Sequence, residues 1–431
     1  MSVLSEKLKY FIDQKGLSIA ELAKSSGIER STLYQYIKDR RPLQNRAQLE
    51  AVMSELHLTP DERAEVLEAY EITRIGVKNY NRRRKVREIM ESLLTIEEGK
   101  PETVKAGQKK SSMEVQSQGL IRGELEVNRI VHQVIQETAE RGGELKLLVQ
   151  PDYDLVMESL MLVKGGLENT RVIHLICLEP DSGQDGCSNL ESIRRVLRYG
   201  IGIRSYEPRY YYGRAKEHYG SMSVLPYLIA ADRCVIQISS DRKAAVLHNE
   251  PGIVEYLNGV FDRMCQQSRL LMVSIDGFGG EQARWGAEYI RTVNFSNTYE
   301  MCSGLCSVQF WDERLIREYP AVFFAEPVSP ADRRELIERI LKAAEEGWYH
   351  IRMVPMEDFL LSYHWEIVIH QGSSMLFQYA FENQFRIFQI EEKDILDAVF
   401  DFMENMAAGS NVLDEVQSAE LIRKWEKQYL A

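Results

Sequence analysis

No apolar run in this sequence approaches the ~20 consecutive residues that a helix needs to cross a lipid bilayer. A secretory signal is also missing, because the opening stretch MSVLSEKLKYFIDQKG carries charges where such a signal has an apolar segment. The two absences predict a cytoplasmic protein that does not bind membranes.

Cysteine is scarce, with six residues in a chain of 431. Cys302 and Cys306 form a close pair, but no second pair of cysteines or histidines stands at the spacing of a structural zinc site. Reduced, partly buried thiols are the expected state in the cytoplasm. The sequence therefore predicts neither a disulfide nor a metal nor any other cofactor.

The short motifs of several common enzyme classes are absent as well. The sequence contains no GxSxG, GxxxxGK[ST], HExxH or GxGxxG stretch. These motifs place a nucleophile, a phosphate-binding loop, a zinc site or a dinucleotide. Their absence favours a protein that is not an enzyme.

Negative charge predominates, and it is unevenly distributed. The formal net charge is −12. Residues 1–94 hold 17 basic and 14 acidic residues, so they carry +3 and the remaining 337 residues carry −15. An acidic surface repels nucleic acid. Any contact with DNA is therefore expected from the N-terminal region.

That N-terminal region has the pattern of several short amphipathic helices. Ser18, with Glu21 three residues later, forms a capping box that predicts the start of a helix. Gly27 permits a sharp turn with positive φ, and a second short helix is expected directly after it. The expected helices cover about residues 4–15, 18–26, 31–38, 47–56 and 61–70.

The stretch AELAKSSGIERSTLYQYIKD resembles the helix-turn-helix of the phage repressor/Cro-like family, often called the XRE family. The resemblance implies a DNA-binding domain over residues 1–75, whose recognition helix enters the major groove. Two positions depart from the family pattern. Ile19 stands where a DNA-contacting glutamine is common, and Asp39 stands where glycine is common.

The residues expected to contact DNA lie on the recognition helix and just after it. Arg30 can form two hydrogen bonds with guanine, and Gln35 can form two with adenine. The basic residues that follow are expected near phosphates. The predicted set is Arg30, Ser31, Thr32, Tyr34, Gln35, Lys38, Arg40 and Arg41. The alternative is a solvated helix face in a protein-interaction module.

A helical pattern continues to about residue 94 and contains NRRRKVR (81–87), in which five of seven residues are basic. Such a run is typical of a solvated face, and it could also contact the DNA backbone. The following residues are polar and typical of a linker. The predicted domains are a helix-turn-helix over 1–75, a helical extension and linker over 76–119, and two α/β halves over 120–270 and 271–431.

Beyond residue 120, short apolar runs alternate with helical patterns, which is typical of an α/β fold. Three such runs precede a helix that contains LNGVFDRM (257–264). Three more precede a helix that contains LDAVFDFM (396–403), 139 residues later. The repeated order favours two similar halves, with Phe261 and Phe400 at equivalent positions. A chance likeness between two α/β segments is the alternative.

One aromatic stretch stands apart from this alternation. In YEPRYYYGRAKEHYG (206–220), tyrosines alternate with basic residues. The stretch is expected to be either a lid that stacks on a ligand or a surface loop with a half-buried edge. A strand is expected at GIRSYEP (202–208), which overlaps the start of this stretch.

The tandem order resembles the phospholipase D superfamily, in which two similar α/β halves meet at the active site. Active members carry HxKxxxxD in each half. The corresponding positions here are Leu225, Tyr227 and Asp232, then His364, Glu366 and Gln371. With one histidine and no lysine left, the resemblance implies an inactive relative of these enzymes. It also implies a ligand-binding cleft bordered by Tyr227, Asp232, His364 and Glu366.

Together these patterns favour a transcription regulator that binds double-stranded DNA. The α/β region is expected to sense a small-molecule or protein effector, to hold a homodimer together, or both. One alternative is a phosphodiesterase-like enzyme fused to a helix-turn-helix module. Another is a protein-interaction scaffold whose helix-turn-helix does not contact DNA.

Overall fold

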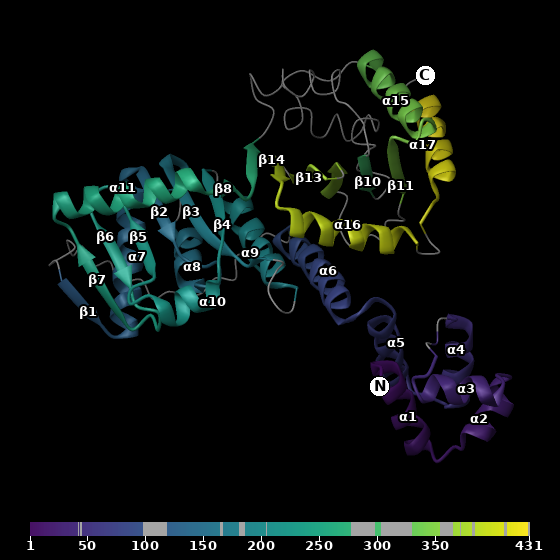
Figure 1. Ribbon diagram of the computed structural model, residues 1–431. Helices are drawn as coiled ribbons and strands as arrows, with labels where there is room; N and C mark the ends of the chain where they lie inside the picture. The colour runs from purple at the N-terminus through teal and green to yellow at the C-terminus, as the bar shows by residue number, and fades with distance from the viewer. Residues whose placement is uncertain are drawn as a thin grey trace. The chain divides into compact units, whose positions relative to one another are not determined.

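The computed structural model describes residues 1–41, 43, 45–97, 119–163, 167–180, 186–203, 205–276, 298–302, 330–353, 365–370, 372–381, 384–408 and 412–429. These residues divide into two compact units, Met1–Arg84 and Lys85–Ala431 (Figure 1). The first unit is helical and the second combines helices with two sheets. The expected fold class, a helical N-terminal region followed by a larger mixed α/β region, is confirmed.

Six helices are described between residue 1 and residue 97. They are α1 (Val3–Lys15), α2 (Ile19–Ser26), α3 (Arg30–Ile37), α4 (Arg46–Glu55), α5 (Pro60–Ile75) and α6 (Val77–Glu97). No described helix in the chain is both long and apolar enough to span a membrane.

Local capping signals set where these helices begin and end. At the start of α2, the Ser18 side chain accepts a hydrogen bond from the Glu21 backbone, and the Glu21 carboxylate accepts one from the Ser18 backbone. Thr59 and Glu62 form the same reciprocal pair at the start of α5. Gly27 ends α2 with a φ of 70°, a left-handed conformation that costs a glycine little. The predicted turn between α2 and α3 therefore forms as expected.

The second unit contains an eight-stranded sheet. Its strands are β1 (Gly119–Arg122), β2 (Gly143–Leu148), β3 (Thr170–Leu178), β4 (Tyr206–Tyr212), β5 (Tyr227–Ala230), β6 (Val235–Ile238), β7 (Ala244–His248) and β8 (Arg269–Leu270). Their spatial order is β1-β7-β6-β5-β2-β3-β4-β8. Strands β2, β3 and β4 are parallel, whereas β5, β6 and β7 form an antiparallel meander.

Helices cover both faces of this sheet. On one face, Val254 and Phe261 of α11 (Pro251–Gln267) pack on Leu148, Leu175 and other strand residues. The opposite face packs on α7 (Glu124–Arg141), α8 (Asp154–Leu162) and α9 (Ser188–Gly202). Short helical turns complete the connections at η1 (Leu167–Asn169), α10 (Ala215–Glu217) and η3 (His218–Met222).

A six-stranded sheet follows, with the order β11-β10-β12-β13-β14-β9. Its strands are β9 (Val273–Asp276), β10 (Thr298–Cys302), β11 (Tyr349–Met353), β12 (Trp365–His370), β13 (Ser374–Phe381) and β14 (Gln384–Ile390). The accompanying helices are α15 (Pro330–Glu345), α16 (Lys393–Ala407) and α17 (Glu415–Tyr429). Residues of α16 and of this sheet join the main core of the eight-stranded sheet.

Two local expectations from the sequence are wrong. Helix α9 continues to Gly202, so the strand expected at 202–208 begins only at Tyr206. The first half of the tyrosine-rich stretch is neither lid nor loop, because Tyr206–Tyr212 form β4, paired in parallel with β3. Tyr206 and Tyr210 point into the core and are buried. The alternation of large and charged residues is the period of a half-buried strand.

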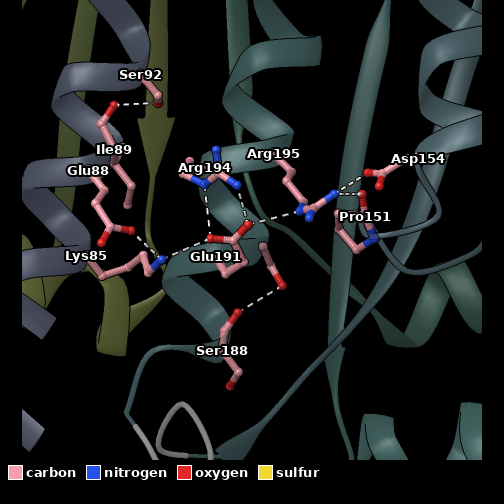
Figure 2. Close-up of polar contacts among 11 residues, drawn as sticks. Lys85, Glu88, Ile89, Ser92, Pro151, Asp154, Ser188, Glu191, Arg194 and Arg195 are labelled. Atoms are coloured by element: carbon pink, nitrogen blue, oxygen red, sulfur yellow. Dashed lines mark hydrogen bonds and ion pairs between the residues drawn. The ribbon is translucent and has the colours of Figure 1, made fainter. Parts of the chain in front are cut away.

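The part of α6 that belongs to the second unit is anchored on its core. Val86, Ile89 and Met90 are buried among residues of the α/β region. Beside them, Lys85 forms ion pairs with Glu88 in its own helix and with Glu191 of α9 (Figure 2). Within the second unit, the C-terminal part of α6 is thus held by apolar packing and by charge.

Candidate nucleic-acid interface

Helix α3 is fixed to the first unit by its apolar side. Leu33, Tyr36 and Ile37 are buried in a core shared with α1, α2, α4 and α5. The phenol of Tyr36 also donates a hydrogen bond to Gln48 Oε1 of α4, at 3.1 Å. Because the helix is held this way, its other side faces solvent.

The predicted DNA-contacting residues lie on that solvent side. Thr32 is half-buried, and the other seven members of the predicted set are exposed. Five of the eight follow one another on α3, and the remaining three come directly after it. The structure thus brings all eight together on one short segment.

Two cations of this surface, Lys38 and Arg40, lie over the ring of Tyr34. The Nζ atom of Lys38 and the guanidinium carbon of Arg40 each lie 5.9 Å from the centre of the Tyr34 ring. At that distance the negative face of an aromatic ring attracts a positive charge. The two cations are therefore held near each other, at the end of α3, without an acidic partner among their described contacts.

Glu29 is a residue of this surface that the predicted set omits. It precedes α3, and its carboxylate accepts a hydrogen bond of 2.7 Å from the Ser31 hydroxyl. The Ser31 hydroxyl is therefore engaged within the protein. A carboxylate at this place repels phosphate but can accept a hydrogen bond from the amino group of cytosine.

Asp39 has a structural reason to stand where the related family commonly has glycine. Its φ of 56° is left-handed, a conformation that aspartate tolerates better than most residues. Its carboxylate accepts hydrogen bonds from the Ser2 backbone, at 2.6 Å, and from the Ser5 hydroxyl. The hydrogen bond from Ser2 is the main reason why the pKa of Asp39 is lowered. Asp39 thereby ties the segment after α3 to the start of α1.

The residues predicted to border a cleft in the α/β region are not all brought together. Tyr227 is the first residue of β5 and is buried, whereas Asp232 is exposed beyond the other end of that strand. A Cβ atom on Gly143, at the start of β2, would lie 2.6 Å from Asp232 Oδ2. Glu366 pairs with Gln378 across β12 and β13, and His364 lies outside the described residues.

Around Tyr227 the structure assembles a cluster that the sequence did not reveal. The Tyr227 ring stacks on that of Tyr219, at 5.1 Å between centroids, and lies 5.4 Å from that of Tyr153. The guanidinium of Arg242 lies 4.3 Å from the centre of the Tyr153 ring. Burial raises the pKa of Tyr153 to about 12, so its hydroxyl remains protonated near neutral pH. These residues come from three separate parts of the chain, which follow β2, β4 and β6, and no local pattern links them.

Three comparisons with known proteins bear on these observations. Residues 8–49 match the family model described as Helix-turn-helix. The solved structure of TrmBL2, described as an archaeal chromatin protein with a novel mode of DNA binding, is similar over 59% of this chain and 88% of its own, with 13% identity and a TM-score of 0.25. No curated protein sequence matches the present chain.

The matched residues begin within α1, include α2, the turn at Gly27 and the whole of α3, and end within α4. They coincide with the exposed surface on which the eight predicted residues lie. The N-terminal region of this chain is therefore a helix-turn-helix domain, of the kind whose second helix reads the major groove of DNA.

Proposed function

We propose that this chain is a transcription regulator that binds double-stranded DNA through α3 and senses an effector through its α/β region. The supporting observation is the exposed set of Arg30, Gln35, Lys38, Arg40 and Arg41 within a helix-turn-helix. The first two can read base edges, and the last three can contact phosphates. The charge balance supports the same assignment, because the acidic remainder of the chain repels DNA.

We also propose that the protein binds DNA as a homodimer. One helix-turn-helix contacts only a few base pairs, and dimers of such domains read two half-sites about one helical turn (~34 Å) apart. The α/β region has the larger surface on which two copies could associate. Light scattering at micromolar concentration is expected to give twice the monomer mass of 49.8 kDa. A monomer both with and without DNA would contradict this proposal.

The strand order supports a duplication within the α/β region. From one edge, β1-β7-β6-β5-β2-β3 are joined by four antiparallel pairings and then one parallel pairing. The strands β9-β14-β13-β12-β10-β11 follow the same sequence of pairings. A helix follows the meander in each case, α11 in the first and α16 in the second. This shared order favours a duplication over a chance likeness of two α/β segments.

We propose that these halves do not catalyse phosphodiester cleavage. In the resemblance to the phospholipase D superfamily, Tyr227 stands where active members carry a phosphate-binding lysine, and its ring is buried among other aromatic rings. A buried neutral phenol does not supply the positive charge that a phosphoryl group requires. The purified chain is expected not to hydrolyse a chromogenic phosphodiester. Turnover that His364→Ala abolishes would favour the enzyme alternative instead.

DNA binding is tested with the full chain. Selection from a pool of random duplexes is expected to enrich one sequence, and fluorescence anisotropy then gives its affinity. Replacing Arg30 and Gln35 together by Ala should remove the preference for that sequence, whereas Lys9→Ala, an exposed change on α1, should leave it intact. If the double variant retains the preference, α3 is not the reading helix. If no duplex binds at low salt, the scaffold alternative is favoured.

A further inference from the structure

We infer that the end of the eight-stranded sheet where β2 stops binds a small ligand through a carboxylate or phosphate group, with Arg242 as the anchoring cation. The inference rests on the effector-sensing role proposed above and specifies where and how the effector is held. Four residues carry it: Tyr153, Tyr219, Tyr227 and Arg242.

The position in the sheet is one where ligands commonly bind. The parallel strands β2, β3 and β4 present their carboxyl ends together, and the chain passes from β2 to β3 and from β3 to β4 in one direction. On the other side of β2 lies β5, which arrives later in the chain and runs antiparallel. In open α/β sheets, ligands bind outside the carboxyl ends of strands where the order of the strands reverses. Tyr227 opens β5 at this point.

At this point of the sheet, Tyr153 has a buried hydroxyl that forms no hydrogen bond with the described residues. It directly follows the turn after β2 and is 2% exposed. Its hydroxyl is buried and has no hydrogen-bond partner among the described residues. Buried hydroxyls are normally paired, so an unpaired one calls for an explanation. A ligand oxygen that accepts a hydrogen bond from Tyr153 supplies one.

Arg242 is held beside these rings at a cost to the backbone. It lies in the turn between β6 and β7 with a φ of 61°, which favours glycine and is unfavourable for a long side chain. Its guanidinium nevertheless lies over the Tyr153 ring and 5.5 Å from the centre of the Tyr227 ring. A glycine at this position would relax the turn but would lose the cation. The presence of an arginine at this left-handed position is therefore best explained by the positive charge that its side chain places beside Tyr153 and Tyr227.

The charge of Arg242 is only loosely paired. The nearest described carboxylate, that of Asp152, lies 3.6 Å away on a side chain that is 64% exposed. The neighbouring Asp241 is directed elsewhere, because it accepts hydrogen bonds from Ser239 and from the Lys243 backbone. The Arg242 side chain itself is 32% exposed. A planar guanidinium in this state can bind both oxygens of an incoming carboxylate or phosphate.

The turn that carries Tyr153 is also connected to α6. Arg195 of α9 donates a hydrogen bond to the Pro151 carbonyl, at 3.4 Å, and forms an ion pair with Asp154 (Figure 2). Arg195 also contacts Glu191, which binds Lys85 of α6. Residues 151–154 are thus held on one side by Arg242 and on the other by Arg195. A ligand that draws Arg242 away from Asp152 acts on the turn that Arg195 and Glu191 connect to Lys85.

The site is tested by calorimetric titration of the full chain with sodium phosphate and, separately, with sodium benzoate, at an ionic strength kept constant with chloride. At least one anion is expected to bind saturably, and the comparison shows whether phosphate or carboxylate is preferred. Arg242→Gly should weaken that binding at least tenfold. Arg233→Ala, an exposed change beyond the opposite end of β5, should not. No saturable binding, or equal affinity in Arg242→Gly, overturns the inference.

Two further measurements keep the outcomes distinct. Because glycine suits the left-handed turn, Arg242→Gly should unfold at the wild-type temperature or above, so lost binding cannot be attributed to unfolding. DNA affinity is then measured with and without the bound anion. If the anion binds through Arg242 and DNA affinity does not change, the site stands and the sensing role is overturned. If DNA affinity responds equally in Arg242→Gly, the effector is held elsewhere and the site is overturned.

Discussion

Lys85 Nζ lies 3.3 Å from Glu191 Oε2, so within the second unit the C-terminal part of α6 is joined by an ion pair to α9. Glu191 is also contacted by Arg194 and Arg195. Its partial burial opposes ionisation, but these hydrogen bonds and the charge of Lys85 prevail and lower its pKa to about 2. The Glu191 carboxylate thus forms ion pairs with three cations, Lys85 of α6 and Arg194 and Arg195 of α9.

Removing that carboxylate should weaken the α/β unit more than removing Lys85. Glu191→Gln leaves three positive charges close together, whereas Lys85→Met leaves Glu191 with two partners. The coupling between Lys85 and Glu191 should be about 0.2–1 kcal/mol, because both side chains remain partly solvated. Urea unfolding followed by tryptophan fluorescence measures it, since all five tryptophans lie beyond residue 84. Equal losses in the two single variants would contradict the central role of Glu191.

Acid should destabilise the α/β unit through His174, which is fully buried. Its Nδ1 accepts a hydrogen bond of 2.6 Å from the Tyr206 hydroxyl, and its Nε2 donates one of 3.1 Å to the Val149 carbonyl. Burial lowers the pKa of His174 to about 4 from the ordinary 6.5. The unfolded chain therefore takes up a proton more readily, and stability falls as the pH drops from about 6.5 towards 4.

Between pH 7 and pH 5 this proton uptake should cost about 2 kcal/mol. Urea unfolding at the two pH values measures the loss. His174→Gln cannot titrate, so the variant should be less stable at pH 7 but should lose this share of the pH dependence. The same loss in wild type and variant would show that another group is responsible.

The helices of the first unit were predictable because their signals are local. Ser18 and Glu21 cap the same helix that they predict, and Gly27 sits at the turn that requires it. The exposed side of α3 follows from that geometry alone, since its buried and exposed residues alternate with the helical period. Neither inference needs any contact between residues distant in the sequence.

The α/β unit was less predictable because its determinants are not local. Strand β4 pairs with β3, from which it is separated in the sequence by α9, and this pairing places Tyr206 and Tyr210 in the core. The cluster at Tyr227 is assembled from the segments that follow β2, β4 and β6. The sequence indicated Tyr227 through a resemblance, but nothing near Arg242 marks it as a neighbour of that residue.

Asp39 should be important both for its conformation and for its hydrogen bonds. Asp39→Ala loses the bonds to Ser2 and Ser5 and must keep a left-handed φ, whereas Asp39→Gly loses the bonds but relaxes the backbone. Alanine should therefore be the more harmful change. Hydrogen exchange of the full chain should show that α1 and α3 open faster in both variants than in the wild-type chain. The increase should be larger in Asp39→Ala than in Asp39→Gly. If glycine proves as harmful as alanine, the conformation contributes little.

Arg30 and Arg40 should affect DNA binding in different ways. Arg30→Ala should cost about 1–3 kcal/mol on the selected sequence and little on random DNA, as expected of a base contact. Arg40→Ala should weaken binding to all sequences and should reduce the salt dependence by about one released ion. Anisotropy titrations at several salt concentrations separate the two effects. A uniform loss from Arg30→Ala would place that residue on the phosphate backbone instead.

Phe261 and Phe400 should respond differently to truncation, although the sequence places them at equivalent positions of LNGVFDRM and LDAVFDFM. Phe261 is 1% exposed and packs with Val254 against the eight-stranded sheet, whereas Phe400 is half-buried at the border of the main core. In α16 the fully buried phenylalanine is Phe402. The two phenylalanines at matching sequence positions are therefore not equally buried.

Phe261→Ala should destabilise the α/β unit by about 3–5 kcal/mol, because it opens a cavity in a closed core. Phe400→Ala should cost about 1 kcal/mol, in proportion to the smaller apolar area that it exposes. Phe402→Ala serves as the control for α16 and should approach the loss at Phe261. Urea unfolding followed by tryptophan fluorescence compares the three. Equal losses at Phe261 and Phe400 would restore the equivalence of the two positions, and a small loss at Phe402 would show that α16 packs by another face.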